Sequence, residues 1–403
     1  MMTTKRLVRV SEQAWRAAGS HHVTKIRELL LPGLTAPDHA INSGRQRKGS
    51  KSSDTWLTAL DPTNPVYNFL VEYYGLKGQK GTRRMTRWSP KPDLLLQRDD
   101  RITDLGQLIS PLQRETEAQF DGILLEGASV DDLGGTLHLK GAIPHDEGII
   151  YSPSGFFGQV EDKGKAATPY LWYRNIMQQT LKAEPILHCH GLHEWAMQYW
   201  PEGADPPPSA KYQQHLPLRV SREVVNKAVE RRGISCTHVD ALRFFAPAAG
   251  PLNHHGHSLK REDQLELEQP ACVHTQMDLL KMALKLDAFC DPILLQQILE
   301  IAMAARKLDV AASPYDASAY GVGVIPVETS EGRAEYRRQQ SALMIRAEPV
   351  RRELLQAYDL VLNNGFGENV QEKPMPERYA KAEPGGLPWR KNLLSNPETP
   401  VTN

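Results

Sequence analysis

The sequence predicts an α+β fold, mainly helical, in which a β-containing middle region packs on a C-terminal helical half. In the last third, DPILLQQILEIAMAARKL repeats apolar residues on one helical face and begins with Asp291 as N-cap and Pro292 as first residue. Between about residues 93 and 165, short apolar runs alternate with Gly, Pro and Asp, as in strands joined by loops. With 403 residues, 40% of them hydrophobic, the chain can form a large core.

The N-terminal quarter contains one predicted helix, over residues 11–31, with Ser11 as its N-cap. Residues 42–54 are rich in Gly, Ser and basic side chains, which predicts a flexible insertion. Residues 64–74 are aromatic and aliphatic and are expected to dock in the core. Basic residues then follow without an acidic one up to residue 91.

The middle of the chain has alternating and helical patterns. GTLHLKG, residues 135–141, alternates like a strand. Residues 188–200 are expected to form a loop that leads into a helix. Residues 217–245 then predict a strand, a helix from Ser221 to Gly233, and a second extended segment.

The C-terminal part predicts helices around residues 277–286, after Asp291, and from Ser330 to about 362, the last interrupted before Pro349. The tail has repeated Pro, Lys and Glu and is expected to be disordered. We therefore predict three regions. They are an N-terminal helical region with basic segments (1–92), an α+β core with the candidate site (93–363) and a tail (364–403).

Composition excludes several classes of protein. Lys+Arg and Asp+Glu number 48 each, so no global field attracts nucleic acid or an anionic membrane. No apolar run is long enough to span a bilayer, and the first residues lack a secretory signal. The four cysteines show no Cys-x-x-Cys spacing, so the sequence predicts neither a disulfide framework nor a thiolate zinc site. A cytoplasmic or nuclear protein is expected, and no pattern indicates its oligomeric state.

HCHGLHEW holds three histidines and a carboxylate, His188, His190, His193 and Glu194. Imidazoles beside a carboxylate bind metals or move protons near neutral pH. The His-Glu-x-x-His zinc motif is not present, because Met197 stands four residues after His193. Proton transfer or substrate binding is therefore favoured over a metal, and no cofactor is predicted. A structural role in backbone hydrogen bonding is the alternative.

Two further segments place a histidine near a carboxylate. In THVDALRFF, a strand would put His238 and Asp240 on one side, and a buried Asp240–Arg243 salt bridge would explain the charges without a function. In EQPACVHTQMD, His274 and Asp278 stand four apart and share a helical face. We predict that the three His/carboxylate segments meet in one pocket.

A basic segment offers a separate candidate interface with DNA. It contains five expected phosphate contacts, Lys77, Lys80, Arg83, Arg84 and Arg87, with Trp88 placed to stack on a base. A solvated loop is the alternative interpretation. There is no phosphate-binding loop, no convincing dinucleotide fingerprint and no nucleophile elbow, which disfavours ATP-driven chemistry, Rossmann cofactors and α/β-hydrolase catalysis.

Several blocks resemble a family of bacterial and eukaryotic proteins that carries the name 3-methyladenine DNA glycosylase. They include NPVYNFLVEYY, GLHEWAMQY, HVDALRFFAPAAGPLN, EQPACVHTQMDLLKMALKL and LDVAASPYDASAYGVGVIPVETSEGRAEY. The blocks extend from about Trp15 to Arg346, and the helix-hairpin-helix pattern of other alkyladenine glycosylases is not found. His188 and His190 lie outside the blocks.

The resemblance implies hydrolysis of the N-glycosidic bond of an alkylated purine in DNA. Such an enzyme flips the base into a pocket and uses a carboxylate to activate water or stabilise an oxocarbenium ion. Glu194 or Asp240 is the expected carboxylate, and His193 or His274 the expected acid, with His238 beside them. The expected substrate-binding residues are Trp195, Arg243, Phe244, Phe245, Asp278 and Tyr315. A small-molecule enzyme, with or without a metal, and a non-catalytic nucleic-acid-binding protein are the alternatives.

Overall fold

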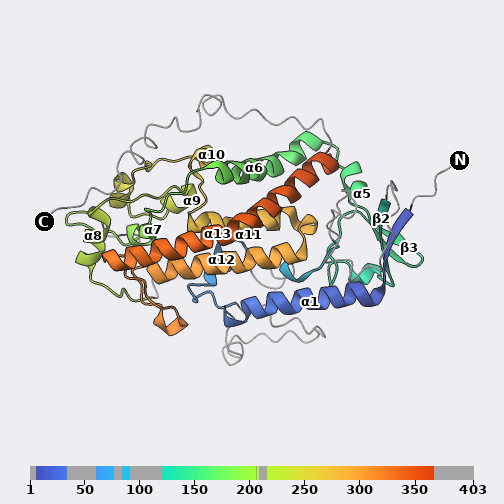
Figure 1. The fold of residues 1–403 in the computed structure, drawn as a ribbon, viewed down its shortest axis with the longest axis horizontal. Coiled ribbons are helices and arrows are strands. Elements are labelled where there is room, and N and C mark those ends of the chain that lie inside the picture. Colours follow the sequence, from blue (N-terminus) through green and yellow to red (C-terminus); the bar gives the residue numbers. More distant parts are fainter. Residues whose placement is uncertain are drawn as a thin grey trace.

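The fold is that of a computed structural model, which describes residues 6–33, 60–76, 84–90, 120–205, 207 and 216–366. Long helices run side by side along the molecule, and a small sheet lies at one end (Figure 1). This confirms the predicted α+β, mainly helical fold. The long helices are α1 (Glu12–Leu30), α6 (Lys163–Lys182), α11 (Val273–Leu286), α12 (Pro292–Ala312) and α13 (Ser330–Leu360).

Short helices connect these elements. They are α2 (Asn68–Glu72), α5 (Pro153–Gly158), α7 (Leu192–Ala196), α8 (Arg222–Glu230), α9 (Val239–Leu242) and α10 (Gln264–Leu267). Single 3₁₀ turns lie at Leu31–Gly33, Val130–Asp132, Pro247–Leu252, Arg261–Asp263, Asp287–Phe289 and Ser318–Tyr320. None of the helices in the described ranges combines the length and apolarity that a membrane span requires.

The sheet has the order β1-β2-β4-β3. Its strands are β1 (Arg6–Val10), β2 (Phe120–Glu126), β3 (Ala142–His145) and β4 (Gly148–Tyr151). β1 is parallel to β2, while β2–β4 and β4–β3 are antiparallel. The strand predicted over residues 135–141 does not form. Leu137 makes only isolated bridges to Trp88 and Leu133, and the strand begins after Gly141, whose φ of 80° breaks the extended conformation.

Two hydrophobic cores share helix α1. Trp15, near its start, packs with Trp88 and strand residues such as Ile123 in the smaller core. Ile26 and Leu30, near its end, belong to the large core of the helical half. Ser11 caps α1 by accepting from the Ala14 amide, as its position predicts. A boundary at residue 92 therefore does not separate the two cores.

Helix α13 continues through Pro349, so the predicted interruption is wrong. A proline inside a helix costs about 3 kcal/mol, because it removes one hydrogen bond and crowds the preceding turn. Here Ala347, Val350 and Leu354 on either side are buried, and α13 packs against α6, α11 and α12. This burial offsets the cost of the proline.

The predicted tail also begins too early. Residues 361–366 form one π-helical turn, and the ring of Phe366 lies 5.0 Å from Phe157 and 5.4 Å from Tyr170. Phe366 is therefore part of the core. The predicted insertion over residues 42–54 and the rest of the tail lie outside the described residues.

Candidate functional site

A cavity of about 120 Å³ opens between α2, α7, α9, α11 and α12. Seven of the predicted site residues line it, namely Glu194, His238, Asp240, Arg243, Phe244, His274 and Asp278. The three His/carboxylate segments, far apart in the sequence, thus come together at one place. Its volume is several times the roughly 10–15 Å³ that one water molecule requires.

Three imidazoles form a row beside the cavity, His193, His274 and His238, which we call the histidine row. The ring centroids of His193 and His274 are 4.4 Å apart, and those of His274 and His238 are 4.7 Å apart with nearly parallel planes. A carboxylate lies at each end. Asp309 Oδ1 is 2.6 Å from His193 Nε2, and Glu268 Oε1 is 3.6 Å from His238 Nδ1.

The carboxylates separate the proton affinities along the histidine row. Burial opposes the charged forms of His193 and His238, but Asp309 and Glu268 outweigh it and raise the pKa of each ring. Burial lowers the pKa of His274 well below its usual value, and the two flanking histidines lower it further. His274 is therefore a neutral imidazole at neutral pH.

Local backbone geometry brings α7 into this row. His190 and Gly191 both have positive φ, 48° and 72°, and this turn starts α7 so that Cys189 faces His193. A Cβ on Gly191 would lie 3.1 Å from the Cβ of Ala312, in a conformation that L residues rarely adopt. Glycine is required there.

The segment that bears His238 and Asp240 is not the predicted strand. His238 is the N-cap of helix α9, and Asp240 lies in its first turn. Asp240 does not pair with Arg243, since its Oδ2 is 3.5 Å from Lys281 Nζ, and the Arg243 guanidinium lies 4.7 Å from the centre of the Phe244 ring. The predicted Asp240–Arg243 bridge is therefore wrong, because Lys281 of α11 approaches Asp240 across the cavity.

Two aspartates in the cavity have opposite pKa shifts. Burial raises the pKa of Asp278, whose Oδ1 accepts from the Tyr74 hydroxyl at 3.2 Å. Burial also acts on Asp240, but the positive charges of Lys281, His238 and Arg243 together outweigh it and lower the pKa of that carboxyl. Asp278 therefore keeps its proton to a higher pH than Asp240.

A buried charge network lies behind the histidine row. The Arg306 guanidinium donates to Glu194 at 2.8 Å, to Asp309 at 2.6 Å and to the Pro65 carbonyl at 2.9 Å. Neither Arg306 nor Asp309 was predicted from the sequence. Their signal is an oppositely charged pair three residues apart in a mostly apolar helix, where charges stay buried only when paired.

Four predicted site residues do not line the cavity. His193 stands behind His274, held by Asp309. The Trp195 indole donates to the Ala312 carbonyl at 2.8 Å, and Phe245 is buried in the large core. The Tyr315 hydroxyl accepts from Gln198 at 3.0 Å. Trp195, Phe245 and Tyr315 are buried core residues rather than walls of the cavity.

The basic segment lies mostly outside the described residues, which omit Lys77, Lys80 and Arg83. Arg84 donates to the Leu284 carbonyl of α11 at 2.5 Å, and Arg87 is half-buried. Trp88 is only 7% exposed within the smaller core, so it is not placed to stack on a base. The expectation of a stacking Trp88 is wrong, because the ring packs beside Trp15.

Four groups among the described residues have ligand atoms close enough together for one metal ion, within 4.8 Å of each other. They are Cys189–His193–Cys236, His193–His274–Asp309, His238–Glu268–Cys272 and His238–Asp240–Asp278. In the last group, Lys281 Nζ already lies 3.5 Å from Asp240 and 3.8 Å from Asp278. The ammonium supplies the positive charge there that a metal would bring.

Comparisons of this chain with protein-family models, with curated proteins and with solved structures found no match.

Proposed function

We propose that the cavity is the active site of an N-glycosidic-bond hydrolase that releases a purine base. The observation that supports this most is the pair Asp240 and Asp278, two carboxyl groups with opposite pKa shifts in one cavity. Environments that separate two pKa values in this way distinguish a general acid from an ionised carboxylate. An oxygen of each lies within 4.8 Å of one of the other.

The two aspartates have complementary roles in this proposal. As the C1′–N bond breaks, its electron pair goes to the base nitrogen, which takes a proton from Asp278. The ionised Asp240 stabilises the positive charge that develops on the sugar. Water then adds its oxygen to C1′ and gives up a proton that passes to the Asp278 carboxylate, which restores the starting protonation. Asp278 thus replaces His274 as acid, since His274 is neutral.

Aromatic side chains favour a planar base as the leaving group. Phe244 and Tyr73 line the cavity with ring centroids 5.7 Å apart, and Phe69 and Tyr74 line it beside them. A base in duplex DNA would have to be flipped out to reach these rings. The resemblance of the sequence blocks to proteins carried under the name 3-methyladenine DNA glycosylase favours alkylated DNA as the source.

A hydrolase of a free nucleoside or another small molecule is the second candidate. One contact favours it. Arg84, one of the expected phosphate contacts, instead donates to the Leu284 carbonyl of α11. The same two aspartates would act in either reaction, so an assay of both substrates distinguishes the two candidates.

The test is release of free base from alkylated duplex DNA and from free purine nucleosides, measured by chromatography with mass detection. Wild-type protein and Asp240→Asn are compared at equal concentration. Release from DNA that Asp240→Asn abolishes supports the proposal, while release from nucleosides alone selects the second candidate. No release from either substrate by folded wild-type protein would overturn both, and DNA binding without release would select a non-catalytic binding protein.

A further inference from the structure

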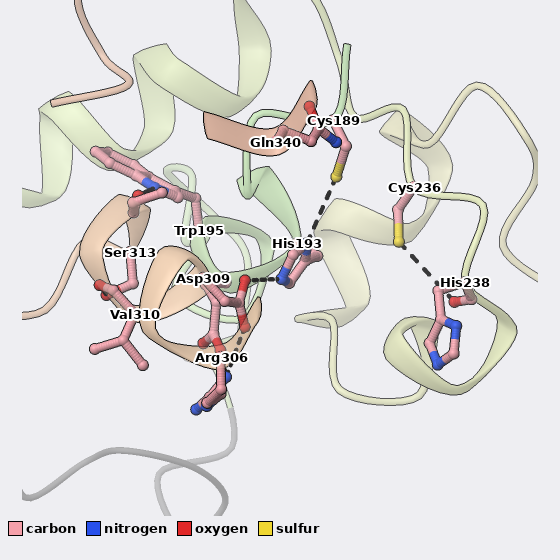
Figure 2. Close-up of polar contacts among 12 residues, drawn as sticks. Cys189, His193, Trp195, Cys236, His238, Arg306, Asp309, Val310, Ser313 and Gln340 are labelled. Carbon is pink, nitrogen blue, oxygen red and sulfur yellow. Dashed lines mark hydrogen bonds and ion pairs between the residues drawn. The ribbon is translucent and has the colours of Figure 1, made fainter. Parts of the chain in front are cut away.

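On the side of His193 away from the cavity, two thiols approach its ring. Cys189 Sγ lies 3.5 Å from His193 Nδ1, and Cys236 Sγ belongs to the same group, with all three ligand atoms within 4.8 Å of one another. Figure 2 shows the Cys189 sulfur directed toward the His193 ring, while the dashed line from the Cys236 sulfur leads to the backbone oxygen of His238. We call these three residues the thiol–imidazole cluster.

The distances fit a tetrahedral zinc ion. Zn–S and Zn–N bonds of about 2.3 and 2.05 Å at the tetrahedral angle separate sulfur from nitrogen by about 3.6 Å and two sulfurs by about 3.8 Å. The observed Cys189–His193 separation is 3.5 Å. Little movement is needed for Cys189 and His193 to bind one ion together, and Cys236 has to approach by at most about an ångström.

The other nitrogen of His193 is already held as zinc-binding histidines are. A metal-bound imidazole donates its second N–H to a carboxylate or carbonyl, which fixes its orientation and its basicity. His193 Nε2 is 2.6 Å from Asp309 Oδ1, and Asp309 is in turn held by Arg306 at 2.6 Å. Figure 2 shows this chain from Cys189 through His193 and Asp309 to Arg306.

A small chamber of about 10 Å³ lies against the thiol–imidazole cluster, with Tyr336 and Gln340 in its walls. Its size suits one water molecule. The Tyr336 hydroxyl and Gln340 Oε1 are buried without a hydrogen-bond partner among the described residues, although Tyr336 is 0% and Gln340 2% exposed. Buried polar groups are rarely left unpaired, so these two indicate a polar occupant.

We propose that Cys189, Cys236 and His193 bind a zinc ion, with a water molecule in the chamber as fourth ligand. Each thiol releases its proton on binding, and the thiolates bind zinc through sulfur. The water would hydrogen-bond Tyr336 and Gln340. The ion ties the segment before α7 to the segment before α9, and so fixes the two walls that bear Glu194 and His238.

This site is independent of the proposed reaction, because His193 and His274 stand between it and the cavity. Zinc is favoured over harder cations because two of the three ligands are thiolates. The two cysteines are 47 positions apart in the sequence, which is why their spacing predicts no zinc site.

The first experiment measures zinc in the full-length protein, produced with zinc and purified under reducing conditions without chelators. We expect about one zinc per chain. Replacement by Co²⁺ should give the thiolate-to-cobalt charge-transfer band and the strong visible bands of a tetrahedral ion. Folded protein without zinc, or with Cys189 and Cys236 joined in a disulfide under these conditions, would overturn the proposal.

The second experiment assigns the ligands. Cys189→Ser and Cys236→Ser should each lose the ion at chelator concentrations that wild-type protein withstands. Cys290→Ser, a buried thiol elsewhere in the core, should retain it, and so should Cys272→Ser, although Cys272 lines the chamber. Loss of the ion in Cys272→Ser would replace the water by a third sulfur ligand and overturn the assignment. If the first two variants do not fold, X-ray absorption at the zinc edge of wild-type protein decides. Two sulfur ligands with nitrogen or oxygen support the assignment, and any other sulfur number overturns it.

Discussion

Two buried aspartates, Asp309 behind the histidine row and Asp278 in the cavity, differ in how their charges are compensated. Behind His193, both oxygens of Asp309 are bonded, one to the ring and one to Arg306, and the side chain is fully buried. In the cavity, Asp278 is also buried, yet its Oδ2 accepts no hydrogen bond from any residue that the structure describes. A buried carboxylate with both oxygens hydrogen-bonded supports the fold. Within the described ranges, Asp278 Oδ2 has only the Lys281 ammonium 3.8 Å away, so its ionised form costs stability and this oxygen is available to a ligand.

The largest effect is expected on stability, at Asp309. Asp309→Asn leaves Arg306 and His193 without their shared anion, and should lower the free energy of unfolding by about 3–5 kcal/mol. Urea denaturation measures the loss. The control is Glu300→Gln, which removes an ion pair with the half-exposed Arg346. Its free energy of unfolding should fall by less than about 1 kcal/mol. Equal losses in both variants would show that the buried network is not structural.

The next effect is on turnover and tests the role of Asp240 in the cavity. Asp240→Asn removes the charge that stabilises a cationic transition state and should lower turnover roughly a hundredfold. Its side chain is 48% exposed, so the free energy of unfolding should change little. Asp359→Asn, outside the cavity, is the control and should retain full turnover. Unchanged turnover in Asp240→Asn would remove this residue from the mechanism.

A smaller effect is expected on binding. Phe244→Ala removes a ring from the wall of the cavity and should weaken binding of a base-bearing ligand by about 1–3 kcal/mol. Trp200→Ala deletes an exposed ring outside the cavity and serves as the control. Calorimetric titration measures both. Equal affinities of the two variants would exclude stacking on Phe244.

The smallest effect has the opposite sign. Because burial raises the pKa of Asp278, its ionised form opposes folding at neutral pH, and this penalty disappears below the unfolded pKa near about 3.9. Asp278→Asn keeps an acceptor for Tyr74 and should stabilise the protein by about 0.5–2 kcal/mol at neutral pH. Denaturation at neutral and acidic pH measures this gain, which should vanish in acid. A variant less stable than wild type at neutral pH would contradict the raised pKa.

Local patterns predicted the helices well and the distant contacts poorly. Asp291 caps α12 by accepting from the Ile293 and Leu294 amides, as the Asp-Pro start predicts, because a cap depends only on neighbours. His274 and Asp278 both line the cavity, as their spacing on one helix predicts. The interruption before Pro349 did not form, because packing with other helices outweighed the local penalty.

The candidate site was only partly predictable for the same reason. His238 and Asp240, and likewise His274 and Asp278, are close in sequence, so their spacing alone predicted that each pair shares one side of the site. Lys281 and Arg306 come from other helices, and only the fold places them beside Asp240 and Glu194. The pairing of Cys189 with Cys236 likewise depends on how α7 and α9 pack. Side chains from distant segments meet through tertiary structure, which spacing does not reveal.

Helix α1 has a consequence for the order of events during synthesis. Strand β1, which directly precedes α1, pairs with β2 more than a hundred residues later in the sequence. Helix α1 itself packs on α12, which ends at Ala312. At roughly 5–20 residues per second, the ribosome needs roughly 15–60 s to make the chain from the end of α1 to the end of α12. Ile26, in the large core, therefore lacks many of its native neighbours for most of translation, whereas the smaller core around Trp15 is complete once Tyr151 has been made. The exposed C-terminal half of α1 is thus a natural binding site for chaperones during synthesis.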